Sequence, residues 1–274
     1  MKAEAQPRST RAGQRGSLRL TFEALGGRTV LSERFASTPF GAVRAGYPDV
    51  SGIAEVQVTN PAGGVLGGDR LDIKATLCPG SAATILTQGA TKLYRGEEAR
   101  QDALLDIGEN ALLEYIPHHL IPYAGSGYRQ TTEFRLADDA TLLAWDACAA
   151  GRVARGERFA FRSLSNRTRI FRVGVPEVVD GFELSGGDEP FGGYSYMGTL
   201  YLISPSNLSS LSEKLHDSAN SIPNALASAS LPSPNLCVVR TLTRKAPDLY
   251  RTLNNCRTTV RSFLNLPFQP RQVW

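Results

Sequence analysis

Alternation of apolar and polar residues constrains the fold of this chain more than any other feature. Leu18, Leu20, Phe22 and Ala24 are each separated by a single polar residue. This period places alternate side chains on opposite faces of a β-strand, so that one face is buried and the other meets water. It predicts strands over residues 17–24, 28–35, 54–58, 71–77, 83–87, 112–116, 129–136, 141–146, 157–164, 168–173 and 236–242.

Turn signals separate these segments at intervals of about ten residues. Gly26-Gly27 predicts a tight hairpin, and Pro79-Gly80 predicts a turn between two strands. The chain holds 26 glycines and 16 prolines, which suits many short strands joined by turns. We therefore expect a mostly β protein in which large multi-stranded antiparallel sheets pack together as one domain.

Helical periodicity appears only in the C-terminal third. Apolar residues recur three or four positions apart over residues 206–220 and again over residues 248–266, which predicts two amphipathic helices. Asp248 is the expected N-cap of the second helix, and Pro267 is expected to end it. The stretch 221–234 is rich in Ser, Pro and Ala, which predicts a loop.

The N-terminal residues 1–16 lack any apolar period and predict a disordered tail, followed by a single domain over residues 17–274. This tail has no apolar core of a secretory signal, and no stretch approaches the length of a membrane span. We therefore expect a cytoplasmic protein that does not enter a membrane. The net charge is +4 without any run of five like charges, so no nucleic-acid partner is expected.

Residues 63–69, with the sequence GGVLGGD, form the densest glycine cluster. Their spacing fits neither the dinucleotide-binding GxGxxG pattern nor a P-loop, which needs Gly-Lys-Ser/Thr. The residue types by themselves predict a wide turn in which the glycines adopt positive φ.

Few residues suggest catalysis or a metal centre. His118 and His119 are adjacent, so on a strand their side chains point in different directions, although one imidazole could still bind a transition metal. The chain contains no GxSxG and no HExxH motif. From motifs alone, the sequence indicates a β-rich protein without an assigned function.

Eight segments nevertheless follow one another in a characteristic order. They are GGRT at 26–29, YP at 47–48, NPAGGVLGGD at 60–69, TQGATKLYR at 87–95, LEYIP at 113–117, LAWD at 143–146, GR and GE within 151–157, and PRQVW at 270–274. Together they resemble the urease accessory protein D family, called H in some organisms, over residues 17–274. The segments at 60–69 and 87–95 are the most specific.

This resemblance implies many β-strands with two helices near the C-terminal part, and a protein that is not an enzyme. It implies a scaffold that binds apo-urease and the accessory proteins F and G, the last of which is a GTPase that carries nickel. The D-type protein would pass nickel onward through a water-filled internal channel. We therefore expect transient nickel and no tightly bound cofactor.

The resemblance also assigns candidate residues. For the nickel passage they are Asp69, Thr91, Asp146, Glu157 and Asp180, the last at a position where the family often has Glu. The motif residues are Gly63, Gly64, Gly67, Gly68, Gly89, Lys92, Tyr94 and Arg95, and the additional metal-ligand candidates are His118 and His119.

Two other functions stay open. A β-rich hydrolase with its site near residues 63–69 would turn over a substrate and would need a Ser or Asp. A generic β-rich binding module would form a stable complex without depending on nickel. The chain also departs from the family pattern at residues 118–123 (HHLIPY), where many members carry Gln, Glu or Asp at the first two positions.

Overall fold

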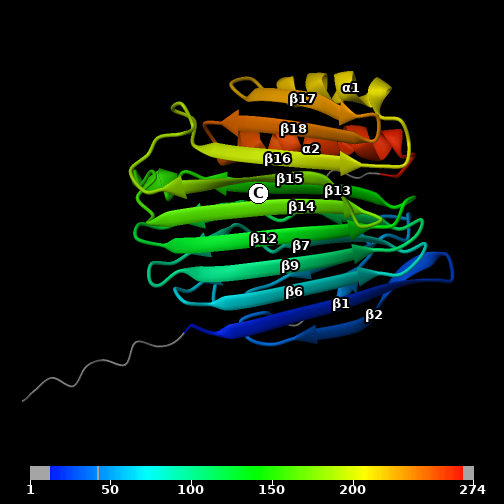
Figure 1. Cartoon of the computed structure of the whole chain (residues 1–274), viewed down its shortest axis with the longest axis horizontal. Helices are drawn as coiled ribbons and strands as arrows, with labels where there is room; N and C mark the ends of the chain where they lie inside the picture. The colour runs from blue at the N-terminus through cyan, green and yellow to red at the C-terminus, as the bar shows by residue number, and fades with distance from the viewer. Residues whose placement is uncertain (1–12, 42, 268–274) are drawn as a thin grey trace, which may run out of the picture.

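Two large β-sheets account for most of the structure (Figure 1), a computed structural model that describes residues 13–41 and 43–267. The first sheet contains, in spatial order, β15 (Val175–Ser185), β14 (Ser163–Arg172), β12 (Gly127–Leu136), β9 (Ala99–Ile107), β6 (Arg70–Leu77), β1 (Arg15–Leu25) and β2 (Arg28–Ala36). The second contains β17 (Leu226–Ser233), β18 (Leu236–Thr243), β16 (Tyr196–Ile203), β13 (Thr141–Ala149), β10 (Leu112–Tyr115), β7 (Ala82–Thr87), β4 (Ala54–Val58) and β3 (Ala45–Gly46). Short strands β5 (Gly64–Val65), β8 (Thr91–Leu93) and β11 (Leu120–Pro122) extend the second sheet.

The mostly β class is confirmed, but the prediction of antiparallel sheets is wrong because both sheets are mixed. Strands β1, β6, β9, β12 and β14 run parallel to one another, as do β4, β7, β10 and β13. Antiparallel pairs include the β1–β2 hairpin at Gly26-Gly27, which was predicted correctly, and the pairs β14–β15, β13–β16, β16–β18 and β17–β18.

The connections explain the parallel pairing. From β6 to β14 the main strands alternate between the sheets, so the turn at Pro79-Gly80 crosses from the first sheet to the second and closes no hairpin. A chain that crosses twice returns to its own sheet in its original direction. Alternation does not reveal this arrangement, because it records which face of a strand is buried and not the direction of the neighbouring strand.

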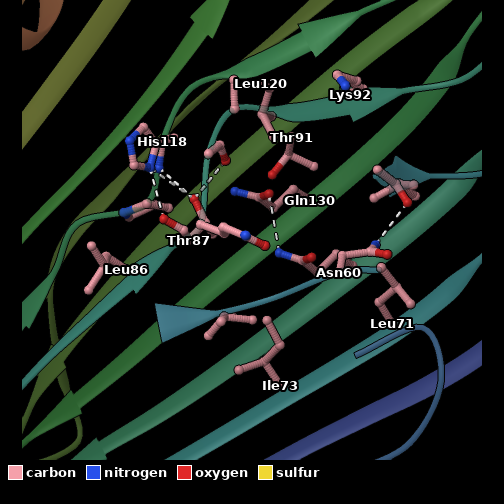
Figure 2. A pocket seen from close by; sticks show the side chains of 18 of the residues that line it. Asn60, Leu71, Ile73, Leu86, Thr87, Thr91, Lys92, His118, Leu120 and Gln130 are labelled. Atoms are coloured by element: carbon pink, nitrogen blue, oxygen red, sulfur yellow. Dashed lines mark hydrogen bonds between the residues drawn. The ribbon is translucent and has the colours of Figure 1, made fainter. Parts of the chain in front are cut away.

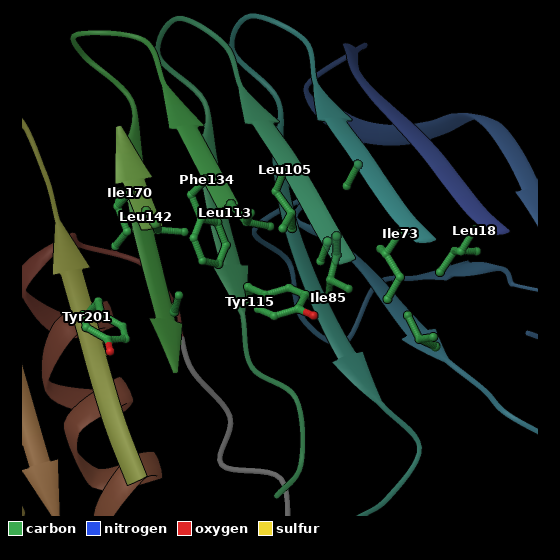
Figure 3. Close-up of a cluster of buried hydrophobic side chains, with 14 of the residues drawn as sticks. Leu18, Ile73, Ile85, Leu105, Leu113, Tyr115, Phe134, Leu142, Ile170 and Tyr201 are labelled. Atoms are coloured by element: carbon green, nitrogen blue, oxygen red, sulfur yellow. The ribbon is translucent and has the colours of Figure 1, made fainter. Parts of the chain in front are cut away.

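The main core lies between the facing sheets (Figure 3). Leu18, Ile73 and Leu105 come from the first sheet, and Ile85 and Leu142 come from the second. The alternation of the sequence therefore identifies the inward positions correctly. Any polar residue at such a position interrupts an apolar interior and needs a partner there.

Both predicted helices are present and lie beside β16, β17 and β18 (Figure 1). They are α1 (Ser209–Asn220) and α2 (Ala246–Phe263), and their apolar faces form a second core with the outer face of the second sheet. The N-cap of α2 is Lys245, so the prediction of Asp248 as N-cap is wrong. The helix begins at Ala246, and Pro247 favours this start because its fixed φ suits the first turn, in which Asp248 also lies.

Two further predictions of secondary structure are wrong. Residues 226–233 of the predicted loop form β17, which is held by backbone hydrogen bonds to β18 and has mostly exposed side chains. The predicted strand at 157–164 begins only at residue 163, since Gly156 and Phe159 adopt positive φ and bend the chain. Strands β9, β15 and β16 and the 3-10 helix η1 (Val153–Arg155) were not predicted.

The first strand begins two residues before the predicted end of the N-terminal tail, because Arg15 and Gly16 belong to β1. Residues 1–12 and the PRQVW segment at 270–274 lie outside the described residues. Within residues 13–41 and 43–267, no helix is both long and apolar enough to cross a membrane.

Candidate functional site

A row of polar side chains crosses the inner face of the first sheet. Gln101 on β9, Gln130 on β12 and Asn166 on β14 stand abreast on neighbouring strands. The Gln101 Nε2 amide donates to Gln130 Oε1 over 3.4 Å, and Gln130 Nε2 donates to Asn166 Oδ1 over 3.1 Å. These neutral groups satisfy one another inside an otherwise apolar interior.

A second polar row lies beside the first. Thr132, Thr168 and Asp180 stand abreast on β12, β14 and β15. The Thr168 hydroxyl donates to Asp146 Oδ2 over 3.2 Å, and this bond joins the first sheet to the second.

The facing strands of the second sheet carry a third row. Asp146 on β13, Thr199 on β16 and Arg240 on β18 stand abreast. We call the three rows together the polar stripe, which comprises Gln101, Gln130, Asn166, Thr132, Thr168, Asp180, Asp146, Thr199 and Arg240.

Two cavities adjoin at the polar stripe. The first has a volume of about 270 Å³ and the second a volume of about 610 Å³, and Asp146, Asn166 and Phe182 line both. Figure 2 shows Thr87 from the second sheet and Gln130 from the first sheet among the side chains around the first cavity. All residues of the polar stripe except Thr132 and Thr168 thus line one or both of the adjoining cavities.

Asp146 lies where the two cavities meet. Burial between the sheets raises its pKa to about 7, although the hydrogen bond from Thr168 acts in the opposite direction. Near neutral pH this carboxyl group therefore exchanges a proton readily, and its ionised form has little compensation from neighbouring donors.

Asp180 has many more donors. Its Oδ2 accepts from the Tyr201 hydroxyl over 2.8 Å and from the Arg240 guanidinium, and its Oδ1 accepts from the Gly181 amide over 2.8 Å. Burial raises the pKa of Asp180, but these donors outweigh burial and leave the pKa below its ordinary value. Asp180 therefore stays ionised, with three hydrogen bonds to its carboxylate.

Several other sequence candidates also line the cavities. Thr91 lines the first cavity with Gly63, Gly64, Gly89 and Lys92, which come from the two most specific motif segments. Gly64 allows close packing there, because a Cβ on this residue would lie 2.3 Å from the Lys92 carbonyl oxygen. The structure thus brings together Thr91, Asp146 and Asp180 along one pair of cavities.

The remaining motif residues support this region from outside the two cavities. Gly67 packs on Gly96, and a Cβ on Gly67 would lie 2.6 Å from the Gly96 Cα. Gly68 adopts a φ of 84°, the ring of Tyr94 packs edge-on against Tyr123, and Arg95 is exposed.

The two histidines bind different neighbours. His118 lines the first cavity, and its Nδ1 lies 2.9 Å from the carbonyl oxygen of Thr87, which can only accept, so Nδ1 carries the proton. His119 is buried, and its Nδ1 lies 2.6 Å from the Tyr250 hydroxyl. Burial lowers the pKa of both histidines, that of His119 to about 4, and both are neutral at pH 7.

Asp69 and Glu157 lie outside the linings of both cavities. Asp69 is buried, and its carboxylate accepts backbone N–H groups from Gln14 and Leu66, each over 2.9 Å. Glu157 pairs with the guanidinium of Arg152 near the surface. In this structure Asp69 fixes the glycine-rich loop and the start of β1.

Replacing Asp69 with alanine is expected to lower the free energy of unfolding by about 1–3 kcal/mol, because two backbone N–H groups lose their hydrogen bonds to a buried carboxylate. Urea unfolding curves would measure the loss. Asp72→Ala is the matched control, since Asp72 lies three residues further along the chain, on β6, with an exposed side chain. Equal unfolding midpoints for the two variants would contradict this structural role of Asp69.

Sequence reasoning missed Gln101, Gln130, Asn166 and Arg240. A usable signal was present, because each lies on a strand at the position where alternation requires an apolar residue. Asn166, for example, follows Leu164 by two residues on the inner face of β14. Among the described residues, no group of three or more His, Cys, Asp or Glu side chains is arranged to hold a metal ion.

The fold and the site define a class: a two-sheet β protein whose core is crossed by a polar stripe between adjoining cavities. The family model described as UreD urease accessory protein matches residues 14–274. The chain belongs to this family, which confirms the resemblance seen in the sequence.

Individual relatives agree with this assignment. The chain is 37% identical to the urease accessory protein UreD of Sorangium cellulosum over 71% of this chain and 64% of that protein. It is 34% identical to the UreD of Cenarchaeum symbiosum, over 71% of this chain and 72% of the relative, and 38% identical to that of Herpetosiphon aurantiacus, over 68% of each. The match to the Sorangium protein therefore spans slightly less than two thirds of its length.

Proposed function

We propose that this chain assists urease maturation without catalysing a reaction, by letting nickel pass between its two sheets along the polar stripe. The observation that carries this proposal is the pair of adjoining cavities that share Asp146 and Asn166 in their walls. Membership of the urease accessory protein family supports the role in maturation.

The chemistry of the polar stripe suits a mobile cation. Amide, hydroxyl and carboxylate oxygens can replace part of the water around a divalent ion, and a sparse set of them holds the ion weakly. In its ionised form Asp146 supplies negative charge at the junction. Nickel is the cargo here and not a resident cofactor.

Apo-urease and the accessory proteins F and G are the proposed partners. We infer that the G protein supplies nickel, the F protein links it to this chain, and urease receives the metal. A direct path through the protein would keep the ion from being captured by other ligands in solution.

The deciding experiment is activation of apo-urease by nickel, bicarbonate, GTP and the F and G proteins, with and without this chain. We expect urease activity to appear at a rate that depends on the amount of this chain. Activation at an equal rate without it, together with no complex on a sizing column, would refute the proposal.

A further inference from the structure

Arg240 occupies an unusual position in the polar stripe. It stands at an inward register position of β18, abreast of Thr199 and Asp146, yet about 62% of its side chain is exposed. Its guanidinium binds Asp180 Oδ2, and both residues line the second cavity. A positive charge therefore lies at the open side of a path proposed to carry a cation.

The two members of the Arg240–Asp180 ion pair differ in how firmly they are held. Asp180 keeps two other donors, the Tyr201 hydroxyl and the Gly181 amide, and is mostly buried. Arg240 is the more exposed member of the pair and sits on a long flexible stem. The Arg240 guanidinium can thus move into solvent while the Asp180 carboxylate stays in place.

We propose that Arg240 acts as a built-in competing cation, which occupies Asp180 until a divalent ion arriving along the polar stripe displaces it. This inference rests on the proposed nickel passage and adds a control at its exposed end beside Arg240. Competition keeps the affinity for the metal low at this end, because the metal must replace an existing ion pair. A weakly held ion can then be released to a partner.

Direct binding measurements test this role separately from urease activation. Nickel would be titrated into the purified full chain by calorimetry at fixed pH and ionic strength. Arg240→Gln is expected to bind nickel about two- to fivefold more tightly, the range for removing one partly exposed competing ion pair. Asp180→Asn should bind more weakly, and the double variant Arg240→Gln/Asp180→Asn should match Asp180→Asn.

Arg167→Gln is the charge-matched control, because Arg167 is exposed on the outer face of β14. Arg167→Gln should leave nickel affinity unchanged. An equal gain in nickel affinity in Arg167→Gln and Arg240→Gln would show that the effect comes from net charge alone and would overturn the proposal. If Arg240→Gln binds nickel no more tightly while Asp146→Asn still weakens binding, the passage survives and the role of Arg240 fails. If Asp146→Asn also has no effect, the proposed passage fails and the role of Arg240 fails with it.

Discussion

Replacing Glu114 with alanine is expected to lower the free energy of unfolding by about 3–5 kcal/mol, the usual cost of removing one partner from a buried ion pair. Glu114 on β10 is 1% exposed beneath α2. Its Oε2 accepts from Arg257 over 2.6 Å, from Arg261 over 3.0 Å and from the Thr84 hydroxyl over 2.7 Å. The variant leaves both buried guanidinium groups without the carboxylate that they share.

The sign of the pH dependence follows from the same contacts. Burial raises the pKa of Glu114, but Arg257 and Arg261 outweigh burial and leave the pKa below its ordinary value of 4.5. The stabilisation is therefore complete above pH 4.5 and is lost as the pH falls through the lower, folded-state pKa. The difference between wild type and Glu114→Ala should shrink on acidification.

Guanidinium chloride unfolding at several pH values would measure this difference. Glu133→Ala is the control, because Glu133 forms a surface pair with Arg135, which is 58% exposed, and should cost less than about 1 kcal/mol. A loss for Glu114→Ala no larger than that for Glu133→Ala would show that the cluster does not anchor α2.

Replacing Asp146 with asparagine should make the folded protein more stable and urease activation slower. The wild-type carboxyl has a folded-state pKa of about 7 against an ordinary value of 3.8, so the folded state binds more protons between these values. Wild-type stability therefore falls as the pH rises from 3.8 to 7, and then levels off. The variant avoids this loss, and at pH 8 it should gain roughly 2–4 kcal/mol.

The same variant should slow nickel-dependent urease activation by about tenfold or more, because the proposed passage loses the carboxylate at the junction of the cavities. Thermal unfolding at pH 5 and pH 8 would be compared with activation rates for the same preparations. The matched control is Asp72→Asn, which removes a carboxylate on the exposed face of β6. Wild-type activation by a stabilised Asp146→Asn protein would remove Asp146 from the passage.

The sequence by itself determined many of the strands and their buried faces, although β9, β15, β16 and β17 were not predicted. Alternation at Leu18, Leu20 and Phe22 is a direct consequence of a core on one side of a strand, and the structure buries all three. Helical spacing likewise determined α1 and α2, because their apolar stripes must cover a sheet. The family motifs also pointed to Asp146, which lines both cavities.

Only the tertiary structure decided which strands are neighbours and in which direction they run. The side-chain period is the same for parallel and antiparallel strands, so alternation could not reveal crossings between two sheets. For the same reason it could not show that Asp146, Asp180 and Arg240 converge, since they lie on strands far apart in the chain. The sequence motifs made Asp69 and Asp146 equal candidates for the nickel passage. In the structure Asp69 accepts hydrogen bonds from two backbone N–H groups, whereas Asp146 lines a cavity.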